Sequence, residues 1–331
     1  MQIVGLDIGG SKTHAVSSSD HASTYEVFAG SANLSSVGEA EAGRQLDMIF
    51  DRLADRGPIA AVCAGAAGVD TPEAEERLRQ LIACRLGGLN ATATVRIVHD
   101  TELVLAAAEL TYGIALIAGT GSVAWGRYPG GRVARAGGWG YLLGDEGSGY
   151  GIAREAVRHA LRIGDTGRQA DLLSQKLLAA CNLQRPDQLI DHFYANPERR
   201  YWAGQAKVVF DLASAGDTVA RRIVDQAAAD LAVLVRTVNS ALGESARNLP
   251  VVLGGGVLVH QPLLQDAVRQ ALVADGLTDL RPLDRDPAHG ALFLAKQLAT
   301  ASVSDADRPV PLTRRSPGHS IQSWSRVMQR Q

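Results

Sequence analysis

The sequence predicts an α/β protein of two lobes that share one topology and enclose a central cleft. Within residues 1–112, three short β-type runs precede alternating helical and β-type segments, in the order βββαβαβα. This order begins again near residue 113, and in both halves a glycine-rich turn joins the first two runs. We therefore expect a duplicated fold, with lobes of residues 1–112 and 113–301 and a tail of residues 302–331.

The elements of the first half follow from their composition and hydrophobic period. Three runs rich in Ile, Val, Thr, Ser and Phe, joined by turn-forming residues at 9–11 and 20–21, predict an antiparallel meander. Apolar residues at three- and four-residue steps then predict helices that alternate with two further strands. The expected meander strands are 2–8, 13–19 and 23–29, the helices are 38–55, a segment from Pro72 onward and 101–110, and the later strands are 59–65 and 94–98.

The second half repeats the pattern with a larger helical content. Residues 113–137 predict a second meander, and residues 217–242 carry one continuous apolar stripe at helical spacing. A strand over 251–255 and helices over 261–273 and 288–299 complete this half. Residues 302–331 lack periodicity and contain three prolines, which predicts a mostly disordered tail.

Composition restricts the classes of function. The chain has 331 residues, a length typical of about two domains, and its net charge of −2 excludes a basic footprint for nucleic acid or an anionic membrane. No apolar run approaches the ~18 residues of a membrane span, and the N-terminus lacks the pattern of a signal peptide. Three widely spaced cysteines indicate a reducing compartment, so we expect a cytoplasmic protein.

Two glycine-rich turns are candidates for phosphate binding. In residues 5–13, GLDIGGSKT, a carboxylate at a strand end precedes a turn whose N–H groups and hydroxyls suit phosphate oxygens. This is not a Walker A loop, because Ser11 stands where its lysine would be. Residues 117–126, IAGTGSVAWG, hold the equivalent turn of the second half. Each alone also fits a plain hairpin turn, but their equivalent places predict that both bind one nucleotide.

A third glycine-rich segment follows a strand near the end of the chain. In residues 251–260, VVLGGGVLVH, three successive glycines permit close approach of a flat ring or a ribose to the backbone. The structural alternative is a helix N-terminus packed against a strand. The strand-turn-helix fingerprint G-x-G-x-x-G does not occur, which disfavours a dinucleotide site.

Several polar residues near strand and helix ends are candidates for chemistry. Asp100 follows a strand and precedes a helix, so it fits either a helix N-cap or a general base at the ligand-binding edge of a sheet. Asp145 and Glu146 lie in residues 137–151, where seven glycines exceed what a helix cap by Ser148 requires. The sequence has neither zinc-ligand spacing of Cys and His nor a G-x-S-x-G elbow.

The three glycine-rich segments, in this order, resemble the phosphate 1, phosphate 2 and adenosine motifs of the sugar kinase, actin and heat-shock chaperone ATPase superfamily. Within it, residues 63–70, 99–108 and 137–157 resemble the N-acetylglucosamine kinase branch of the BadF/BadG/BcrA/BcrD ATPases. The resemblance spans about residues 1–300.

The resemblance implies two ribonuclease H-like lobes that close over ATP and a hexosamine, in a homodimeric enzyme. It implies transfer of the ATP γ-phosphate to the 6-hydroxyl of N-acetyl-D-glucosamine, with ATP and Mg²⁺ required. Asp7 would hold Mg²⁺ through water, and Asp100 would be the general base. The other implied contacts are Gly9, Gly10, Ser11, Lys12, Thr13, Gly119, Thr120, Gly121 and Ser122 with phosphates, Gly254, Gly255 and Gly256 with adenosine, and Asn33, Asp100, Thr120, Gly138, Trp139, Asp145 and Glu146 with the sugar.

Three alternatives remain open at this point. Glucosamine and N-acetylmuramic acid are rival substrates. A BadF-type activator of a dehydratase would hydrolyse ATP and carry an iron–sulfur cluster, although the chain has no obvious cysteine pair for one. A non-enzymatic, nucleotide-switched sugar sensor or regulator would bind ATP without phosphorylating a small molecule.

Overall fold

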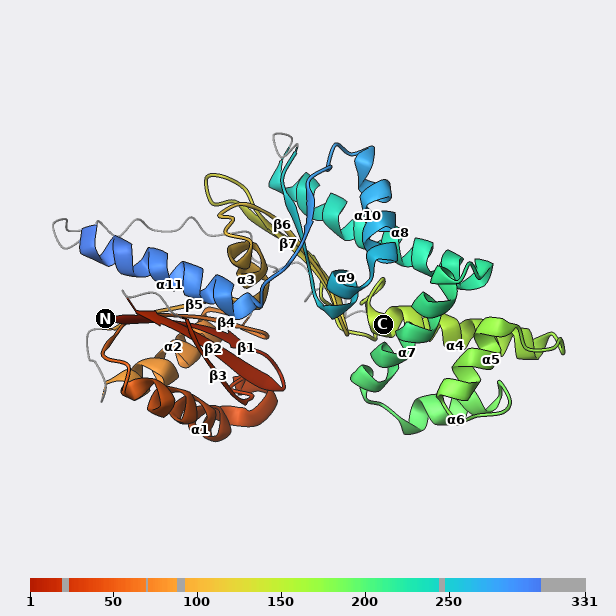
Figure 1. Cartoon of the computed structure of the whole chain (residues 1–331), viewed down its shortest axis with the longest axis horizontal. Helices are drawn as coiled ribbons and strands as arrows, with labels where there is room; N and C mark the ends of the chain where they lie inside the picture. Colours follow the sequence, from red (N-terminus) through yellow and green to blue (C-terminus); the bar gives the residue numbers. More distant parts are fainter. Residues whose placement is uncertain (20–23, 70, 88–92, 244–247, 305–331) are drawn as a thin grey trace, which may run out of the picture.

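The computed structural model describes the chain in five stretches and contains two five-stranded mixed sheets flanked by helices (Figure 1). The predicted turn at 20–21 and most of the predicted tail lie outside the described residues. The described stretches are 1–19, 24–69, 71–87, 93–243 and 248–304.

The first sheet has the strand order β3-β2-β1-β4-β5, in which β1 is antiparallel to β2 and parallel to β4. Alternation along β1 gives the sheet two covered faces. Val4, Leu6 and Ile8 are buried in a core with α1 and α2, whereas Ile3 contacts residues of α11 on the opposite face. The elements are β1 (Gln2–Ile8), β2 (Lys12–Ser19), β3 (Tyr25–Gly30), α1 (Leu34–Ala54), β4 (Ile59–Ala66), α2 (Pro72–Leu86), β5 (Thr94–His99) and α3 (Asp100–Ala107).

The second sheet has the order β10-β9-β6-β7-β8, which repeats the first with corresponding parallel and antiparallel pairs. The predicted duplication is therefore confirmed. The sequence did not predict β10 or the short α9, because three and five residues are too few to show a period. The strands are β6 (Gly113–Ala118), β7 (Ser122–Arg127), β8 (Val133–Gly137), β9 (Val251–Gly254) and β10 (Leu280–Pro282), with helices α8 (Thr218–Leu242), α9 (Gly256–His260) and α10 (Pro262–Val273).

Four further helices form a group beside the second sheet, between β8 and α8, on the right in Figure 1. They pack on one another and on α8 around a core that includes Trp202 and Phe210. The first begins at a cap predicted from the sequence, because the Ser148 hydroxyl accepts a hydrogen bond from Gly151 N–H at 3.0 Å. They are α4 (Gly149–Asp165), α5 (Leu172–Ala180), α6 (Gln188–Ala195) and α7 (Arg199–Ser214).

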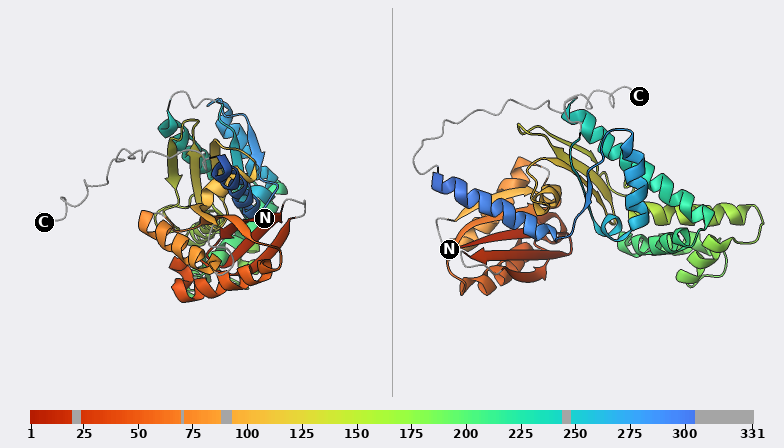
Figure 2. Two further views of the ribbon diagram at one scale, coloured as in Figure 1. Left: turned by 90° about the vertical axis from the view of Figure 1, so that its left-hand side faces the viewer. Right: turned by 45° about the horizontal axis from the view of Figure 1, so that its top comes forward.

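The last helix, α11 (Pro287–Ser304), crosses back to the first sheet, where it packs on β1, β4 and α3 (Figures 1 and 2). The approach is close at two glycines. A Cβ atom at Gly5 would lie 2.1 Å from the Leu292 nitrogen, and one at Gly290 would lie 2.1 Å from the Leu103 carbonyl oxygen. The limits of the predicted lobes remain predictions, but this helix, which we grouped with residues 113–301, covers the sheet of the other half.

Candidate active site

The carboxyl ends of β1 and β5 bring two predicted site residues to one edge of the first sheet. Ile8, Ala66 and His99 pair in one row across β1, β4 and β5. Asp7 lies just before this row and Asp100 just after it. In open α/β sheets ligands bind at this edge.

Asp7 shares its surroundings with two other carboxylates. The pKa of Asp7 is raised to about 7, first by burial and then by the charges of Asp286 and Asp100, while those of His14 and Lys12 lower it. The carboxylates of Asp100 and Asp286 are therefore near enough to Asp7 to influence its ionisation. A cation placed beside these carboxylates would relieve the cost of charging them.

The Asp100 side chain is free to act on a ligand. It is not the N-cap of α3, so that alternative is wrong: His99 is the cap, and its ring accepts a hydrogen bond from Thr101 N–H at 3.3 Å. Oδ1 of Asp100 lies 2.8 Å from Nδ1 of His99 but lacks hydrogen-bond geometry, so this buried atom has no hydrogen-bond partner in the described part of the chain. The side chain is 36% exposed. The exposed part of this carboxylate is accessible to a substrate hydroxyl.

The predicted phosphate 1 turn is a tight connection between β1 and β2. Gly9 N–H donates to the Lys12 carbonyl at 3.0 Å, and the Ser31 hydroxyl donates to the Gly9 carbonyl at 2.8 Å. Ser11 and Lys12 are exposed, as phosphate contacts require. Thr13 differs from the expectation, because its side chain is buried and its hydroxyl accepts from Ala32 N–H at 2.9 Å. Thr13 therefore stabilises the turn and does not present its hydroxyl to a nucleotide.

The predicted phosphate 2 turn and adenosine segment lie side by side. A Cβ atom at Gly119 would lie 3.7 Å from the Gly256 nitrogen, and β6 and β9 pair in parallel just before these residues. Gly255 has φ of 82°, and a Cβ atom there would lie 2.5 Å from the Ala118 carbonyl oxygen, so this position requires glycine. Gly256 and Gly254 complete the segment. No atom lies within 4 Å of a Cβ at Gly256, which leaves space beside the turn.

Asp145 braces the phosphate 2 turn. Its side chain is 5% exposed, and Oδ1 accepts a hydrogen bond from Ser122 N–H at 3.1 Å. A Cβ atom at Gly121 would lie 2.8 Å from the same oxygen, so the carboxylate packs directly on the turn. The residue itself has φ of 63°, an uncommon conformation for a non-glycine residue. Thr120 is partly buried in this turn.

Two other predicted sugar contacts differ in how much of the side chain is available to a ligand. Asn33, by default a loop residue, is the N-cap of α1: its side-chain oxygen accepts from the N–H groups of Ser35 and Ser36, and its amide donates to the Ala67 carbonyl at 2.7 Å. One amide N–H remains for a ligand. Trp139, next to Gly138, is 69% exposed and offers an open ring face.

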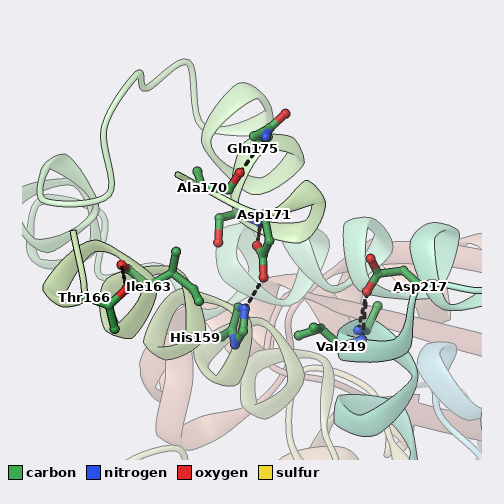
Figure 3. A network of polar contacts seen from close by, with 10 residues as sticks. His159, Ile163, Thr166, Ala170, Asp171, Gln175, Asp217 and Val219 are labelled. Atoms are coloured by element: carbon green, nitrogen blue, oxygen red, sulfur yellow. Dashed lines mark hydrogen bonds and ion pairs between the residues drawn. The ribbon is translucent and has the colours of Figure 1, made fainter. Parts of the chain in front are cut away.

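Glu146 is an exposed residue at a cavity of the second lobe. It lines a cavity of about 370 Å³ between α4 and α8 whose walls contain no residue of the first lobe. The Asp230 carboxyl on α8 is near it, since burial first and then the charges of Glu146 and Glu155 raise the pKa of Asp230. Figure 3 shows another cavity residue, His159, paired with Asp171 at 2.6 Å. Neither Asp7 nor Asp100 lines this cavity.

The fold brings three residues to the site that the sequence did not predict there. Asp286 lies just before α11, and its Oδ1 is 2.9 Å from Nδ1 of the buried His14 on β2. Arg200, on α7, donates a hydrogen bond to the Ser11 hydroxyl at 2.7 Å. The pairs are 272 and 189 residues apart, so no local pattern could reveal them. The Asp-Pro pair that starts α11 was a detectable signal of a helix start, but not of a site.

Within the described stretches, no three or more His, Cys, Asp or Glu side chains are arranged to hold a metal ion directly. No helix there is long and apolar enough to span a bilayer.

Two lobes of repeated topology, with glycine turns at equivalent hairpins and carboxylates at the sheet edge between them, define a nucleotide-binding protein of the ribonuclease H-like class. The chain belongs to the BadF/BadG/BcrA/BcrD ATPase family, whose model matches residues 4–295. The predicted family and fold class are thereby confirmed.

Individual relatives cover nearly the whole chain. A protein of Clostridium acetobutylicum named N-acetylmuramic acid/N-acetylglucosamine kinase is 32% identical over 303 residues, which are 89% of this chain and 98% of the relative. A Dictyostelium discoideum protein named N-acetyl-D-glucosamine kinase is 28% identical over 315 residues, covering 88% and 97%. A crystal structure of a candidate N-acetylglucosamine kinase from Porphyromonas gingivalis shares the fold, with a TM-score of 0.69, 22% identity, and coverage of 90% and 99%.

Proposed function

We propose that this protein is an ATP-dependent kinase that phosphorylates the 6-hydroxyl of N-acetyl-D-glucosamine. The observation that carries the proposal is the partly exposed Asp100 carboxylate, which lies near Asp7 at the carboxyl ends of the strands of the first sheet. The names of two relatives support the sugar class. The two glycine-rich turns, together with the glycine segment beside the second of them, would supply a binding surface for ATP.

In the proposed reaction the sugar O6 attacks the γ-phosphorus of ATP. The O6–P bond forms, the bond from that phosphorus to the β,γ-bridging oxygen breaks, and ADP leaves. Asp100 orients the hydroxyl and accepts its proton, a role worth roughly 10²- to 10⁴-fold in rate. Backbone N–H groups of residues 9–11 and 119–122 position the phosphates, since phosphoryl transfer depends mainly on positioning and charge stabilisation.

The group of carboxylates around Asp7 fits Mg²⁺ held through water. Asp7 is a partly buried oxygen donor beside further negative charge, and Mg²⁺ keeps several waters when it binds proteins and phosphates. When bound, the ion would neutralise charge on the β- and γ-phosphates. Asp7 would orient its water shell, with Asp286 as a second acceptor for that shell.

The sugar contacts in this proposal follow the geometry above. Trp139 and Gly138 would face the ring, and the remaining N–H of Asn33 would donate to a hydroxyl. Asp145 would contribute through Thr120 and the turn that it braces, whereas Glu146 would be a weaker contributor, because its side chain lines the cavity behind the loop. Cytoplasmic location and homodimer formation stay predictions.

N-acetylmuramic acid is the second candidate substrate, favoured by the name of the Clostridium relative. An assay also distinguishes the dehydratase activator and the regulator from the kinase.

Purified protein with ATP and Mg²⁺ should release ADP only when an acceptor is present. The panel is N-acetylglucosamine, N-acetylmuramic acid, glucosamine and glucose.

We expect the highest kcat/KM for N-acetylglucosamine and a product phosphorylated at O6 by NMR. Higher kcat/KM for N-acetylmuramic acid or glucosamine would correct the substrate. Sugar-independent ATP hydrolysis by a protein with iron–sulfur absorbance would support the activator, and ATP binding without turnover on any sugar would support a regulator. Either of these two results would contradict the kinase.

A further inference from the structure

The inserted helices of the second lobe contact the phosphate 1 turn of the first lobe through one side chain. Arg200 is the second residue of α7, and its Nη2 donates to the Ser11 hydroxyl at 2.7 Å. In Figure 1, α7 lies on the side of the inserted helices that faces the first lobe. Ser11 is the position where a Walker A loop would carry its lysine. An arginine from the other lobe therefore reaches the position at which a Walker A loop would carry its lysine.

The same turn of α7 also adjoins the phosphate 2 turn. Ala203 lies three residues after Arg200, on the same side of the helix. A Cβ atom at Gly149 would lie 3.2 Å from Cβ of Ala203, and Gly149 N–H donates to the Gly119 carbonyl at 2.8 Å. The start of α7 thus lies between the two turns that we assign to the phosphates of one nucleotide.

The charge of Arg200 is available to a ligand. Among the described residues it forms no ion pair with a carboxylate, and its side chain is exposed. Lys12, the other cation at the turn, interacts electrostatically with Asp7 and Asp286, and its Nζ lies 5.7 Å from the Phe28 ring centroid. A guanidinium has five N–H donors in a fork that matches phosphate oxygens. The Ser11 hydroxyl uses one of them.

We propose that Arg200 is a catalytic residue that binds the γ-phosphate of ATP; this inference rests on the proposed kinase function. Its guanidinium would donate to the non-bridging oxygens of the phosphoryl group while the bond to ADP breaks and the bond to the sugar oxygen forms. The contact with Ser11 holds the side chain over the site before ATP binds. Because Arg200 comes from the second lobe, it supplies its charge only when the lobes are close together.

The test compares Arg200→Met with Arg199→Met. Arg199 is the matched control, since it is the preceding guanidinium of the same helix turn but lies over the Tyr141 ring, 5.7 Å from its centroid, and not at Ser11. We expect Arg200→Met to lower kcat by at least about 100-fold, a minimum set lower than the 10³- to 10⁵-fold contribution of arginine fingers. The KM for the sugar should change less than threefold. Arg199→Met should stay within about threefold of wild type. Added guanidinium ion should partly restore kcat of Arg200→Met but not alter wild type.

Two further variants keep the inference falsifiable. Arg200→Lys keeps a charge and should lose less than Arg200→Met. Ser11→Ala should lower kcat by at most about 10-fold, and an equal loss in Ser11→Ala and Arg200→Met would overturn the inference, because Arg200 would then act only by holding the turn. Unchanged kcat in Arg200→Met, or an equal loss in Arg199→Met, would also overturn it. These outcomes need an active wild-type enzyme; absence of sugar-dependent ADP release in wild type would instead remove the proposed function and this inference with it.

Discussion

At the scale of single residues, the outcome for each polar candidate depended on which backbone groups surround it. From the sequence, Asp100 fits either a helix N-cap or a general base, whereas Asn33 is expected in a loop and as a sugar contact only from the resemblance. The structure makes Asn33 a cap and gives the cap of α3 to His99, so Asp100 keeps an unsatisfied oxygen. The sequence could nominate these residues but could not decide between caps, because that choice depends on backbone angles at each strand end.

The role proposed for Asp100 predicts a loss of turnover without a loss of ATP binding. Asp100→Asn keeps the size of the side chain but cannot accept the hydroxyl proton, so kcat should fall by at least about 100-fold. ATP affinity measured by calorimetry should change less than threefold. Asp51→Asn, at an exposed carboxylate of α1, is the control and should leave both unchanged. Wild-type kcat in Asp100→Asn would exclude the residue as the base.

The raised pKa of Asp7 predicts that its ionised carboxylate, which the proposed function uses, destabilises the folded protein. Its pKa is raised from 3.8 to about 7 by burial first, then by neighbouring carboxylates. The folded protein therefore binds this proton more tightly than the unfolded chain, so the stabilisation is complete below pH ~4 and is lost as pH rises towards 7. Asp7→Asn stays neutral, and at pH 8 it should raise the free energy of unfolding by up to about 4 kcal/mol, as three pKa units imply.

Urea unfolding of the ligand-free protein at pH 8 and pH 4.5 checks this prediction. The gain of Asp7→Asn over wild type should shrink strongly at the lower pH, while Mg²⁺-dependent turnover should be lost at both. A variant less stable than wild type at pH 8 would show that the carboxylate is stabilising as an anion, contrary to the account.

At the scale of elements, regular segments were predictable and short ones were not. Long periodic segments such as α8 and α2 were predicted from spacing, and Pro72 marked its helix start. α1 begins four residues earlier than expected, at Leu34, because the Asn33 cap starts it and Gly38 interrupts its regular angles. β10 lies at the sheet edge, pairing only over 280–282 with β9, so its place is set by tertiary contacts.

The adenosine segment provides a matched pair of glycine substitutions. Gly255→Ala would force a side chain into positive φ and within 2.5 Å of the Ala118 carbonyl oxygen, so we expect a loss of about 2–4 kcal/mol in the free energy of unfolding. Gly256→Ala meets no atom within 4 Å and should change stability by less than about 1 kcal/mol. Thermal unfolding of both variants measures the difference. Equal stability of the two would mean that the turn can relax.

At the scale of the whole molecule, the repeated order of elements and turns was visible in the sequence, and the two matching sheets confirm it. The return of α11 to the first sheet was not visible, because its apolar face fits either sheet and only the close packing at Gly5 and Gly290 selects one. The contacts of Asp286 with His14 and of Arg200 with Ser11 join distant parts of the chain in the same way. The motifs could therefore be predicted from the sequence, whereas the contacts between distant parts of the chain could not.

A crystal structure with N-acetylglucosamine, Mg²⁺ and a non-hydrolysable ATP analogue tests the whole account most directly. We predict one analogue whose β- and γ-phosphates contact both residues 9–11 and residues 119–122, with the sugar O6 within about 2.6–3.2 Å of an Asp100 carboxylate oxygen. An analogue bound by one turn alone, or a sugar hydroxyl out of reach of Asp100, would contradict it.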